Sequence, residues 1–564
     1  MWDGEVAPDR LKEKFPEAIL GVETCGDEVS VRVKKEEILS VCQYLRDDPD
    51  LSFDMLVDLC GVDYPERKER FEIVYLLHSM KRNRRLRLKA GVGEGEGIAS
   101  VEGVWKAAGW LEREVYDMFG VRFEGHTDLR RILTWEGYEG HPLRKDFPLR
   151  GEDFGRYELP AEPPDMELPP SLKEGGDGRY MVINMGPQHP ATHGVLRVVL
   201  KLEGETIVDA VPYIGHLHRG VEKLAESMTW TQALALTDRL DYAAALSNNL
   251  AYMMAVEKLF GVEPPKRAQY IRVMLAEFSR LASHLLWIAT HALDIGAMTV
   301  FFYAFRERET VLGFIEGITG ARLTPSFLRI GGVAADLPEG IEGEIRRFLR
   351  EFPSRVDEYE RLLTENIIWL KRTKDVGVIS AEEAINYGVT GPVLRGSGVE
   401  WDLRKALPYS GYEDFQFDIP TGENGDVYDR YLVRLEEMRQ SARIIEQVLD
   451  KLPPGKIRVE DPRITPPEKG EVMKEIHALT RHFKHFSEGP SPPPGEAYCS
   501  VEGPKGELGW YLVSDGGPRP YRWRVRPPCF LNVAALPAMV RGHLVADVVA
   551  VIGSIDIVLG EIDR

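Results

Sequence analysis

Residues 266–293 read KRAQYIRVMLAEFSRLASHLLWIATHAL, and this stretch sets the architecture of the larger part of the chain. Its apolar side chains recur at intervals of three and four, at Ile271, Met274, Leu275, Phe278, Leu281, Leu285 and Ile288. Such spacing places apolar residues on one face of a helix, so the stretch predicts a long amphipathic helix.

Similar helical patterns surround this stretch. They occupy residues 299–319, 340–372 and 427–452. Asp238 is a candidate N-cap for a further helix that runs to Leu259 and ends at Gly261. Long consecutive helices with short breaks predict a bundle.

Strands are expected on both sides of the helical core. Residues 181–185 form an apolar run, Gly186 and Pro187 form a turn, and residues 194–202 alternate, so a hairpin is predicted. Alternation with Gly and Pro turns returns from Glu496 onward. Within that last part, we interpret residues 544–559 as a buried, strand-rich segment.

The first 150 residues differ from the helical part because short strand-like and helix-like patterns are mixed. Residues 28–33 and 71–77 favour strands, and residues 36–47 carry apolar positions at helical spacing. Residues 147–178 hold six prolines among glycines and acidic residues, which indicates a linker or an extended surface segment. The sequence therefore predicts an α+β chain with three parts. They are a small α/β domain (1–150), a Pro/Gly-rich linker (151–179) and a mainly helical domain (180–564).

Composition narrows the function. The 564 residues include 90 Asp and Glu against 71 Lys and Arg, a formal charge of −19, which argues against nucleic acid as the main partner. No apolar run is long enough to span a membrane, and the amino terminus does not read as a signal peptide, so we expect the chain to stay in the cytoplasm. Five cysteines without a CxxC pair predict buried free thiols, with no zinc or iron–sulfur site in this chain.

The densest polar group is GPQHPATHG at residues 186–194. Its prolines and glycines indicate a rigid loop, and rigidity is useful where the imidazoles of His189 and His193 must be aimed at a ligand. Pro190 argues against the helix that a metal site with this histidine spacing needs. The alternative interpretation is a hairpin tip whose histidines bond to local backbone.

Further polar side chains follow on consecutive predicted elements. They are His216, His218, Arg219, Asp238, Asp241, Tyr242, Glu277, Arg280, His284 and Asp294. Singly, each is typical of a structural role, but a bundle interior can bring such residues together. Tyr hydroxyl and imidazole donors, with a carboxylate to orient the imidazole, suit a dicarbonyl molecule that accepts two electrons and two protons. The residues therefore permit quinone-like redox chemistry without requiring it.

Several of these motifs carry a resemblance to a known family. GPQHPATHGVLR (186–197), IGHLHRGVEK (214–223), GVEWDLRKALPY (398–409) and GEIDR (560–564) resemble the D (49-kDa-type) subunit of respiratory complex I. In the first part, EREVYDMFGVRFEGH and LRRIL, at residues 112–126 and 129–133, are similar to the C (30-kDa-type) subunit. The resemblance spans essentially the whole chain, in the order of fused C/D subunits.

The resemblance implies a fold, and the cysteine pattern excludes the metal site of the enzymes that share it. The D-type part is expected to be similar to the large subunit of nickel–iron hydrogenases, with a helical core flanked by strands. Hydrogenases hold their metals with two CxxC pairs, and this chain has none, so hydrogenase activity is not expected.

The resemblance also implies site residues. His193 and Tyr242 match the donors to the quinone headgroup, and Asp294 matches the acid that pairs with the histidine. His189 is a loop-shaping neighbour with a possible headgroup role. Arg219, with His218 beside it, matches the arginine near the terminal 4Fe–4S cluster of the neighbouring B-type subunit. Glu277, Arg280 and His284 match a core network.

The function that this resemblance implies is that of a C/D subunit of a proton-translocating NADH:quinone oxidoreductase. The chain binds no cofactor itself, and quinone is the substrate. Its partners are the B-type iron–sulfur subunit, the ferredoxin-like I-type subunit and the H-type membrane subunit. Membrane contact comes through these partners, on the cytoplasmic side of the cell membrane. Two alternatives stay open: the same module in a ferredoxin- or F420H2-driven quinone or phenazine reductase, and a non-catalytic assembly scaffold.

Overall fold

The structure is a computed structural model that describes residues 2–3, 6–150, 172 and 179–564. The predicted linker at 151–179 lies almost entirely outside the described residues. The following paragraphs therefore concern the parts of the chain on either side of it.

A five-stranded sheet forms the centre of the N-terminal part. Its strands, in spatial order, are β1 (Ile19–Cys25), β2 (Glu28–Val33), β5 (Arg84–Val92), β4 (Phe71–Ser79) and β3 (Met55–Asp63). Neighbours are antiparallel except for β2 and β5, which run parallel. The strands predicted at 28–33 and 71–77 are confirmed as β2 and β4.

Helices and a small second sheet complete this part. They are α1 (Val6–Lys14), η1 (Lys35–Glu37), α2 (Ile38–Asp47), α3 (Ala107–Phe119), β6 (Gly97–Ala99) and β7 (Arg122–Glu124). The helical pattern at 36–47 is confirmed as η1 followed by α2. Every residue of β3 and β4 is buried, because β3 and β4 are covered on both faces.

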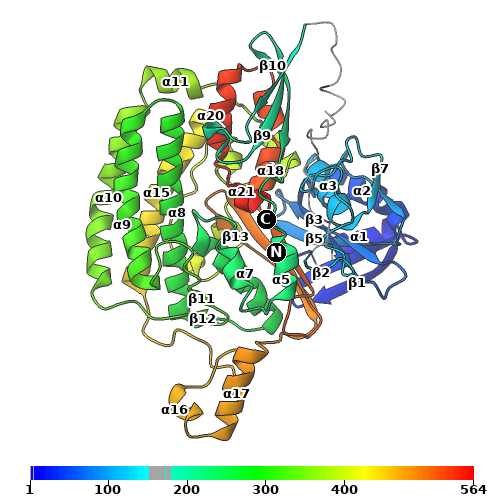
Figure 1. The fold of residues 1–564 in the computed structure, drawn as a ribbon, viewed down its shortest axis with the longest axis vertical. Helices are drawn as coiled ribbons and strands as arrows, with labels where there is room; N and C mark the ends of the chain where they lie inside the picture. The colour runs from blue at the N-terminus through cyan, green and yellow to red at the C-terminus, as the bar shows by residue number, and fades with distance from the viewer. Residues whose placement is uncertain (1, 4–5, 151–171, 173–178) are drawn as a thin grey trace.

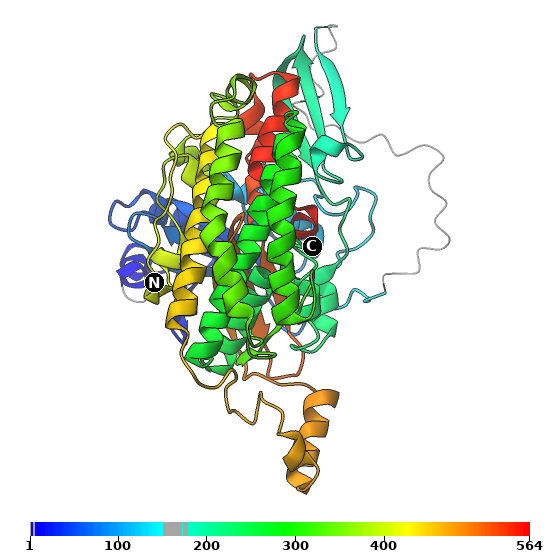
Figure 2. The same cartoon turned by 90° about the vertical axis from the view of Figure 1, so that its left-hand side faces the viewer.

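Four long helices stand side by side in the C-terminal part (Figures 1 and 2). They are α8 (Lys266–Asp294), α9 (Met298–Thr319), α10 (Ile341–Leu363) and α15 (Val427–Lys451). The predicted bundle is confirmed, and α8 begins at the predicted residue. The bundle buries its apolar faces in one continuous core.

Two predicted helices are wrong in their bounds. The pattern at 340–372 is two helices, because α10 ends at Leu363 and α11 (Ile367–Thr373) begins after Asn366, whose side chain accepts hydrogen bonds from Ile368 N and Trp369 N. Asp238 is not an N-cap of the helix that ends near Leu259. That helix, α7 (Ala245–Phe260), begins seven positions later, and Asp238 ends the short α6 (Leu234–Thr237).

Three further sheets flank the bundle. The predicted hairpin is confirmed as β8 (Met181–Met185) and β9 (Arg197–Glu203), which β10 (Thr206–Tyr213) extends to the order β10-β9-β8. A buried antiparallel sheet between bundle and N-terminal part contains β13 (Gly495–Gly503), β14 (Gly506–Ser514) and β15 (Arg522–Arg526). The smallest sheet pairs β11 (Leu328–Arg329) with β12 (Gly332–Val333).

The end of the chain is helical, which contradicts the strand-rich interpretation of residues 544–559. Its helices are α18 (Pro528–Ala534), α19 (Leu536–Val540), α20 (Val545–Ile555) and α21 (Leu559–Ile562). The run of β-branched residues in α20 misled the prediction, because strand propensity depends on context. Val548, Val551, Ile552 and Ile555 are fully buried at helical spacing.

Short elements make up the rest of the described fold. They are η2 (Pro190–Thr192), α5 (Val221–Ser227), α12 (Ala381–Asn386), α13 (Pro392–Gly396), α14 (Leu403–Ala406), η3 (Tyr412–Asp414), α16 (Lys469–Val472) and α17 (Ile476–Ser487). The pair α16 and α17 projects from one end of the molecule (Figures 1 and 2).

Buried ion pairs join the two parts of the chain. Arg524 of β15 binds Asp58 of β3 at 2.7 Å and also contacts Glu114 of α3. The side chain of the last residue, Arg564, contacts the same Glu114 and binds Glu222 through Nε at 3.1 Å. The C-terminal residue is thus enclosed where the two parts meet.

Candidate functional site

The loop between β8 and β9 holds the two predicted histidines in different roles. His189 is exposed, and its Nδ1 accepts a hydrogen bond from Ala191 N at 3.1 Å, so it caps η2. The Thr192 hydroxyl donates to the backbone oxygen of His189 at 2.8 Å. Gly186 has φ of +81°, and a Cβ there would lie 2.2 Å from the backbone oxygen of Leu196. The backbone of this loop is therefore tightly packed in the residues that precede His193.

His193 points toward the end of the long helix α8. It has φ of +51°, and its Nε2 lies 3.4 Å from Oδ2 of Asp294, the last residue of α8. The two side chains are 14% and 18% exposed, so the pair is largely enclosed but not sealed. No side chain among the described residues gives that Nε2 atom a hydrogen bond of good geometry. The pair is thus a close electrostatic contact with capacity for a further partner.

Tyr242 lies in the loop between α6 and α7 and is 51% exposed. The predicted helix start at 238–242 is wrong, because these residues belong to that loop. Burial of its ring, together with the Asp241 carboxylate, raises the pKa of Tyr242 above its ordinary value. The phenol is therefore protonated at neutral pH and able to donate a hydrogen bond.

Asp241, which precedes Tyr242, belongs to a group of buried charges. This group, here called the Lys505 cluster, consists of Lys505, Asp241 and Asp556. Lys505 Nζ lies 3.0 Å from Asp241 and 3.6 Å from Asp556, and it donates to Ser283 at 2.9 Å. Burial alone would lower the pKa of Lys505, but the two carboxylates outweigh it and raise that pKa, so the ammonium stays charged. Burial raises the pKa of Asp556, and Lys505 opposes that rise.

Asp556 connects the imidazole and the phenol. Its charge acts on Tyr242, whose pKa it raises, and the His193 imidazole acts on Asp556, whose pKa it lowers. Asp556 has φ of +59° at the end of α20, and a Cβ added to Gly194, next to His193, would lie 3.5 Å from a side-chain carbon of Leu559 just beyond it. These contacts place the Tyr242 loop and the His193–Asp294 pair near the end of α20.

Arg219 and His218, which the resemblance places near the iron–sulfur cluster of a partner subunit, lie beside the same region. The Arg219 side chain is exposed, and its Nη2 donates to the backbone oxygen of Arg239 at 3.0 Å, three residues before Tyr242. His218 Nδ1 donates to the backbone oxygen of Asp563 at 2.6 Å. His218 is thus used to fix the C-terminal segment, whereas the Arg219 guanidinium faces outward.

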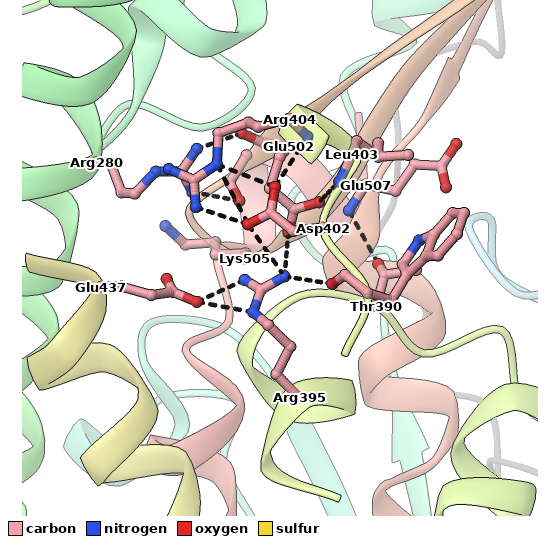
Figure 3. Close-up of polar contacts among 12 residues, drawn as sticks. Arg280, Thr390, Arg395, Asp402, Leu403, Arg404, Glu437, Glu502, Lys505 and Glu507 are labelled. Carbon is pink, nitrogen blue, oxygen red and sulfur yellow. Dashed lines mark hydrogen bonds and ion pairs between the residues drawn. The ribbon is translucent and has the colours of Figure 1, made fainter. Parts of the chain in front are cut away.

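The residues predicted as a core network are confirmed in that role. Arg280 contacts Glu277 at 3.3 Å, and Arg404 binds Glu277 at 3.1 Å. His284 Nε2 donates to Glu437 at 2.8 Å, and Glu437 also binds Arg395 (Figure 3). All of these side chains are fully buried or nearly so. They fix the bundle rather than face a ligand.

Asp238 has a structural role as well. Its carboxylate accepts hydrogen bonds from Asn249 Nδ2 at 2.7 Å and from the Ser326 hydroxyl. It therefore ties the loop before Tyr242 to α7 and to the segment that precedes β11.

Sequence reasoning did not assign Lys505 or Asp556 to the site. Lys505 stands in the turn between β13 and β14, and no local pattern relates it to Asp241. Asp556 stands out in the sequence only as a charge in the apolar segment 544–559. Charged residues are rarely buried unless they are paired, so an acid in such a segment is a usable signal, although Asp547 shares it.

Comparisons with known proteins bear on this arrangement. Residues 31–153 match the family described as respiratory-chain NADH dehydrogenase, 30 Kd subunit, and residues 294–564 match the 49 Kd subunit. A C/D-type NADH-quinone oxidoreductase subunit of Aquifex aeolicus (strain VF5), the one numbered 2 in that organism, is 46% identical over 100% of both chains. The chain belongs to the family of NADH-quinone oxidoreductase C/D subunits.

Two further relatives match the whole chain or its D-type part. The NADH-quinone oxidoreductase C/D subunit of Bdellovibrio bacteriovorus is 47% identical over 96% of this chain and 95% of its own length. The NADH-quinone oxidoreductase D subunit of Geotalea uraniireducens is 60% identical over 68% of this chain and 98% of its own. The resemblance inferred from the C- and D-type motifs is therefore confirmed.

The described residues of this C/D family member contain neither a membrane-spanning helix nor a group of metal ligands. No helix within 2–3, 6–150, 172 and 179–564 combines the length and apolar character needed to cross a membrane. In that same part of the chain, no three His, Cys, Asp or Glu side chains are grouped as metal ligands.

Proposed function

We propose that this chain is the peripheral-arm C/D subunit of a proton-translocating NADH:quinone oxidoreductase and forms part of its quinone-reduction site. Family membership supports the reaction. The observation that carries the site is that Lys505 binds both Asp241, next to Tyr242, and Asp556 at the end of α20, where the His193 loop also packs. The quinone headgroup would lie between the imidazole and the phenol.

Quinone reduction consumes two electrons and two protons and yields a quinol. Negative charge develops on the carbonyl oxygens as electrons arrive, and hydrogen-bond donors stabilise that charge. Tyr242, kept neutral by its raised pKa, donates to one oxygen. His193 donates to the other, with Asp294 at 3.4 Å to orient the imidazole and stabilise its protonated form.

The Lys505 cluster prepares the phenol side of this site. Asp241 Oδ1 accepts a hydrogen bond from Ala243 N at 3.0 Å, and its Oδ2 binds Lys505, so the backbone on either side of Tyr242 is fixed. A rigid phenol loses less entropy when it binds the headgroup. The positive charge of Lys505 also favours negative charge on the substrate.

The electrons are proposed to come from the terminal 4Fe–4S cluster of a neighbouring B-type subunit. Arg219 is exposed beside the Tyr242 loop, where such a subunit would dock, with His218 next to it. A nearby cation favours the reduced cluster and raises its potential. The I-type and H-type subunits are the other proposed partners, and contact with the cytoplasmic side of the membrane is proposed to come through them.

The proposal includes the finer plan of the fold. The helical part from 180 to 564 is proposed to share its architecture with the large subunit of nickel–iron hydrogenases, and residues 1–150 to act as a docked assembly domain. The four-helix core and the flanking sheets support that comparison. The names of the relatives favour NADH over ferredoxin or F420H2 as the source of electrons.

Tyr242→Phe tests the proposal against the scaffold alternative. The phenylalanine keeps the ring and removes the donor, so quinone turnover by the assembled complex should fall roughly 10²-fold or more. Tyr428→Phe, which removes a partly buried hydroxyl on α15 that donates to Thr364 O, is the matched control and should keep turnover. Full turnover in Tyr242→Phe would support a scaffold instead.

A further inference from the structure

Arg434, in the middle of α15, is a fully buried cation that forms no ion pair with the described residues. It has no exposed surface, and its one hydrogen bond within that part of the chain runs from Nη1 to the backbone oxygen of Arg430 at 3.4 Å. Its Nε and Nη2 atoms have no partner among the described residues. The guanidinium lies 4.4 Å from the ring centre of Trp287, a cation–π contact that satisfies none of these N–H groups.

Neighbouring buried arginines are better satisfied. Arg430, one turn away, also forms no ion pair among the described residues, but it donates to Ser554 and to the backbone oxygens of Gly377 and Gly425. Arg395 binds Glu437 at 2.6 Å and Glu502 at 2.8 Å, and Arg404 binds Asp402 at 2.6 Å (Figure 3). A buried guanidinium normally finds such partners, because an unpaired buried cation is costly. Burial lowers the pKa of Arg434 to about 10, although the charges of Asp556 and Glu437 oppose this. An exception of this kind requires a specific physical reason.

Polar atoms without a hydrogen bond, from three other described segments, accompany Arg434. They are Nδ1 and Nε2 of His291 on α8, Oδ2 of Asp556 after α20, and Nε2 of His193 in the β8–β9 loop. Arg434 acts electrostatically on both His291 and Asp556, and His193 acts on the same two groups. Trp287 contacts both the Arg434 guanidinium and the His291 ring, and α20, which ends before Asp556, packs against His291, so these groups form one largely enclosed polar region beside His193.

The His291 ring is confined on several sides. Its two nitrogen atoms therefore have little freedom to turn toward another hydrogen-bond partner. It stacks on Trp287 at 5.3 Å and meets Trp369 edge-on at 5.4 Å. A Cβ on Gly553 would lie 2.3 Å from His291 Nδ1, so the helix backbone of α20 closes another side. Buried water commonly joins such groups, with about three hydrogen bonds per molecule.

We propose that Arg434 binds ordered water that joins it to Asp556 and His193, and that Arg434 is thereby a positioning residue for the quinone site. Its role in turnover rests on the function proposed above. The water site itself does not, because it follows from the unpartnered atoms of Arg434 and His291.

The charges around the two titratable groups give this arrangement a direction. Asp556 faces Lys505 from the β13–β14 turn, Arg434 from α15, Asp241 from the loop before α7, and His193. His291 faces Arg434 and Arg430 from α15, Arg372 from α11, and His193. Arg434 lowers the pKa of both groups, so it favours an ionised Asp556 and, with burial, a neutral His291.

A high-resolution map of the wild-type assembled complex tests the water site directly. We expect at least one ordered water within hydrogen-bond distance of Arg434 Nε or Nη2 that also reaches Asp556 or His193. A direct Arg434–Asp556 ion pair, or a dry contact around Arg434, overturns the proposal. This readout does not depend on quinone turnover, so it separates failure of this inference from failure of the proposed function.

Arg434→Met tests the positioning role in the assembled complex. Without the cation, the pKa of Asp556 rises, so the acid limb of the pH–rate profile should move up by about one pH unit. The kcat at neutral pH should fall roughly 10- to 100-fold. Arg434→Lys should restore part of both, because it returns the charge. Arg439→Met, on the same helix but paired with Asp357 and Glu360, is the matched control and should leave the profile unchanged.

An assembled Arg434→Met complex with an unshifted pH profile overturns the positioning role, whether its rate is normal or reduced. If Arg434→Met does not assemble, Arg434→Gln is assayed in its place with the same two outcomes. The map of the wild-type complex decides the water site in every case.

Discussion

The carboxylate of Asp294, at the last residue of α8, lies 3.4 Å from Nε2 of His193 in the β8–β9 loop. Both residues are mostly enclosed, and the positive φ of His193 aims its ring at the helix end. Segments distant in the sequence thus form an acid–imidazole pair, and this pair is where we expect quinone reduction to be linked to proton movement.

Asp294→Asn should uncouple that link. The amide keeps the shape but cannot stabilise a protonated His193, so quinone reduction should slow about tenfold or more and proton translocation per quinone should fall. The rate of quinone reduction and the proton uptake by reconstituted vesicles, measured together, give both quantities. Asp336→Asn, which alters an exposed partner of Arg267 near the other end of α8, is the control. Full translocation with normal reduction in Asp294→Asn would remove the proposed role.

Lys505→Met should impair the phenol side of the site. It leaves Asp241 and Asp556 buried without their shared cation, which is strongly destabilising for that region. We expect kcat for quinone to fall roughly 10²-fold. Lys505→Arg retains the charge and should recover a measurable part of it. Equal activity of the methionine variant and wild type would show that the Lys505 cluster does not prepare Tyr242.

Gly186→Ala should displace the His193 loop. An added Cβ would lie 2.2 Å from the backbone oxygen of Leu196, so the loop must shift. We expect a higher KM for quinone and a lower kcat, with the complex still assembled. Gly204→Ala is a matched control, because Gly204 also has positive φ, +63°, in the β9–β10 turn but meets no atom within 4 Å. Similar kinetics for the two variants would contradict the steric account.

Glu112 of α3 predicts a pH-dependent stability. Burial raises the pKa of this carboxyl from 4.5 to about 8, although Ser100 and Val101 N donate to it. Between these two values the folded state keeps a proton that the unfolded state loses. The free energy of unfolding therefore falls as pH rises through this window, by up to about 1.4 kcal/mol per pH unit.

Glu112→Gln removes this proton linkage. The variant should gain stability relative to wild type as pH rises from about 5 to about 8, and the difference should level off above that. Thermal unfolding of the purified chain at a series of pH values measures it. Glu13→Gln, at an exposed position of α1, should track wild type. A difference that shrinks with rising pH would contradict the assignment.

The sequence predicted the elements whose pattern is local. Residues 266–293 carried a regular apolar face, so α8 was predicted to within one residue at each end. The hairpin at 181–202 was predicted from an apolar run, a turn and an alternating run. In both cases neighbouring residues along the chain contain the signal.

The errors share a physical cause. The β-branched run in α20 favours a strand locally, but packing of Val548, Val551, Ile552 and Ile555 into the core stabilises a helix instead. Asp238 has the chemistry of an N-cap and is used instead for a buried tie to Asn249. Lys505 approaches Asp241 only because β13 and β14 fold back against α7 and α8. Tertiary packing decides each of these, and no local pattern records it.

The most direct test of the account is a map of the assembled complex with quinone bound in the reducing site. We expect one headgroup oxygen at hydrogen-bond distance, about 2.7–3.0 Å, from the Tyr242 hydroxyl and the other at similar distance from His193. A headgroup that contacts neither side chain, or a reducing site formed elsewhere in the complex, would contradict it.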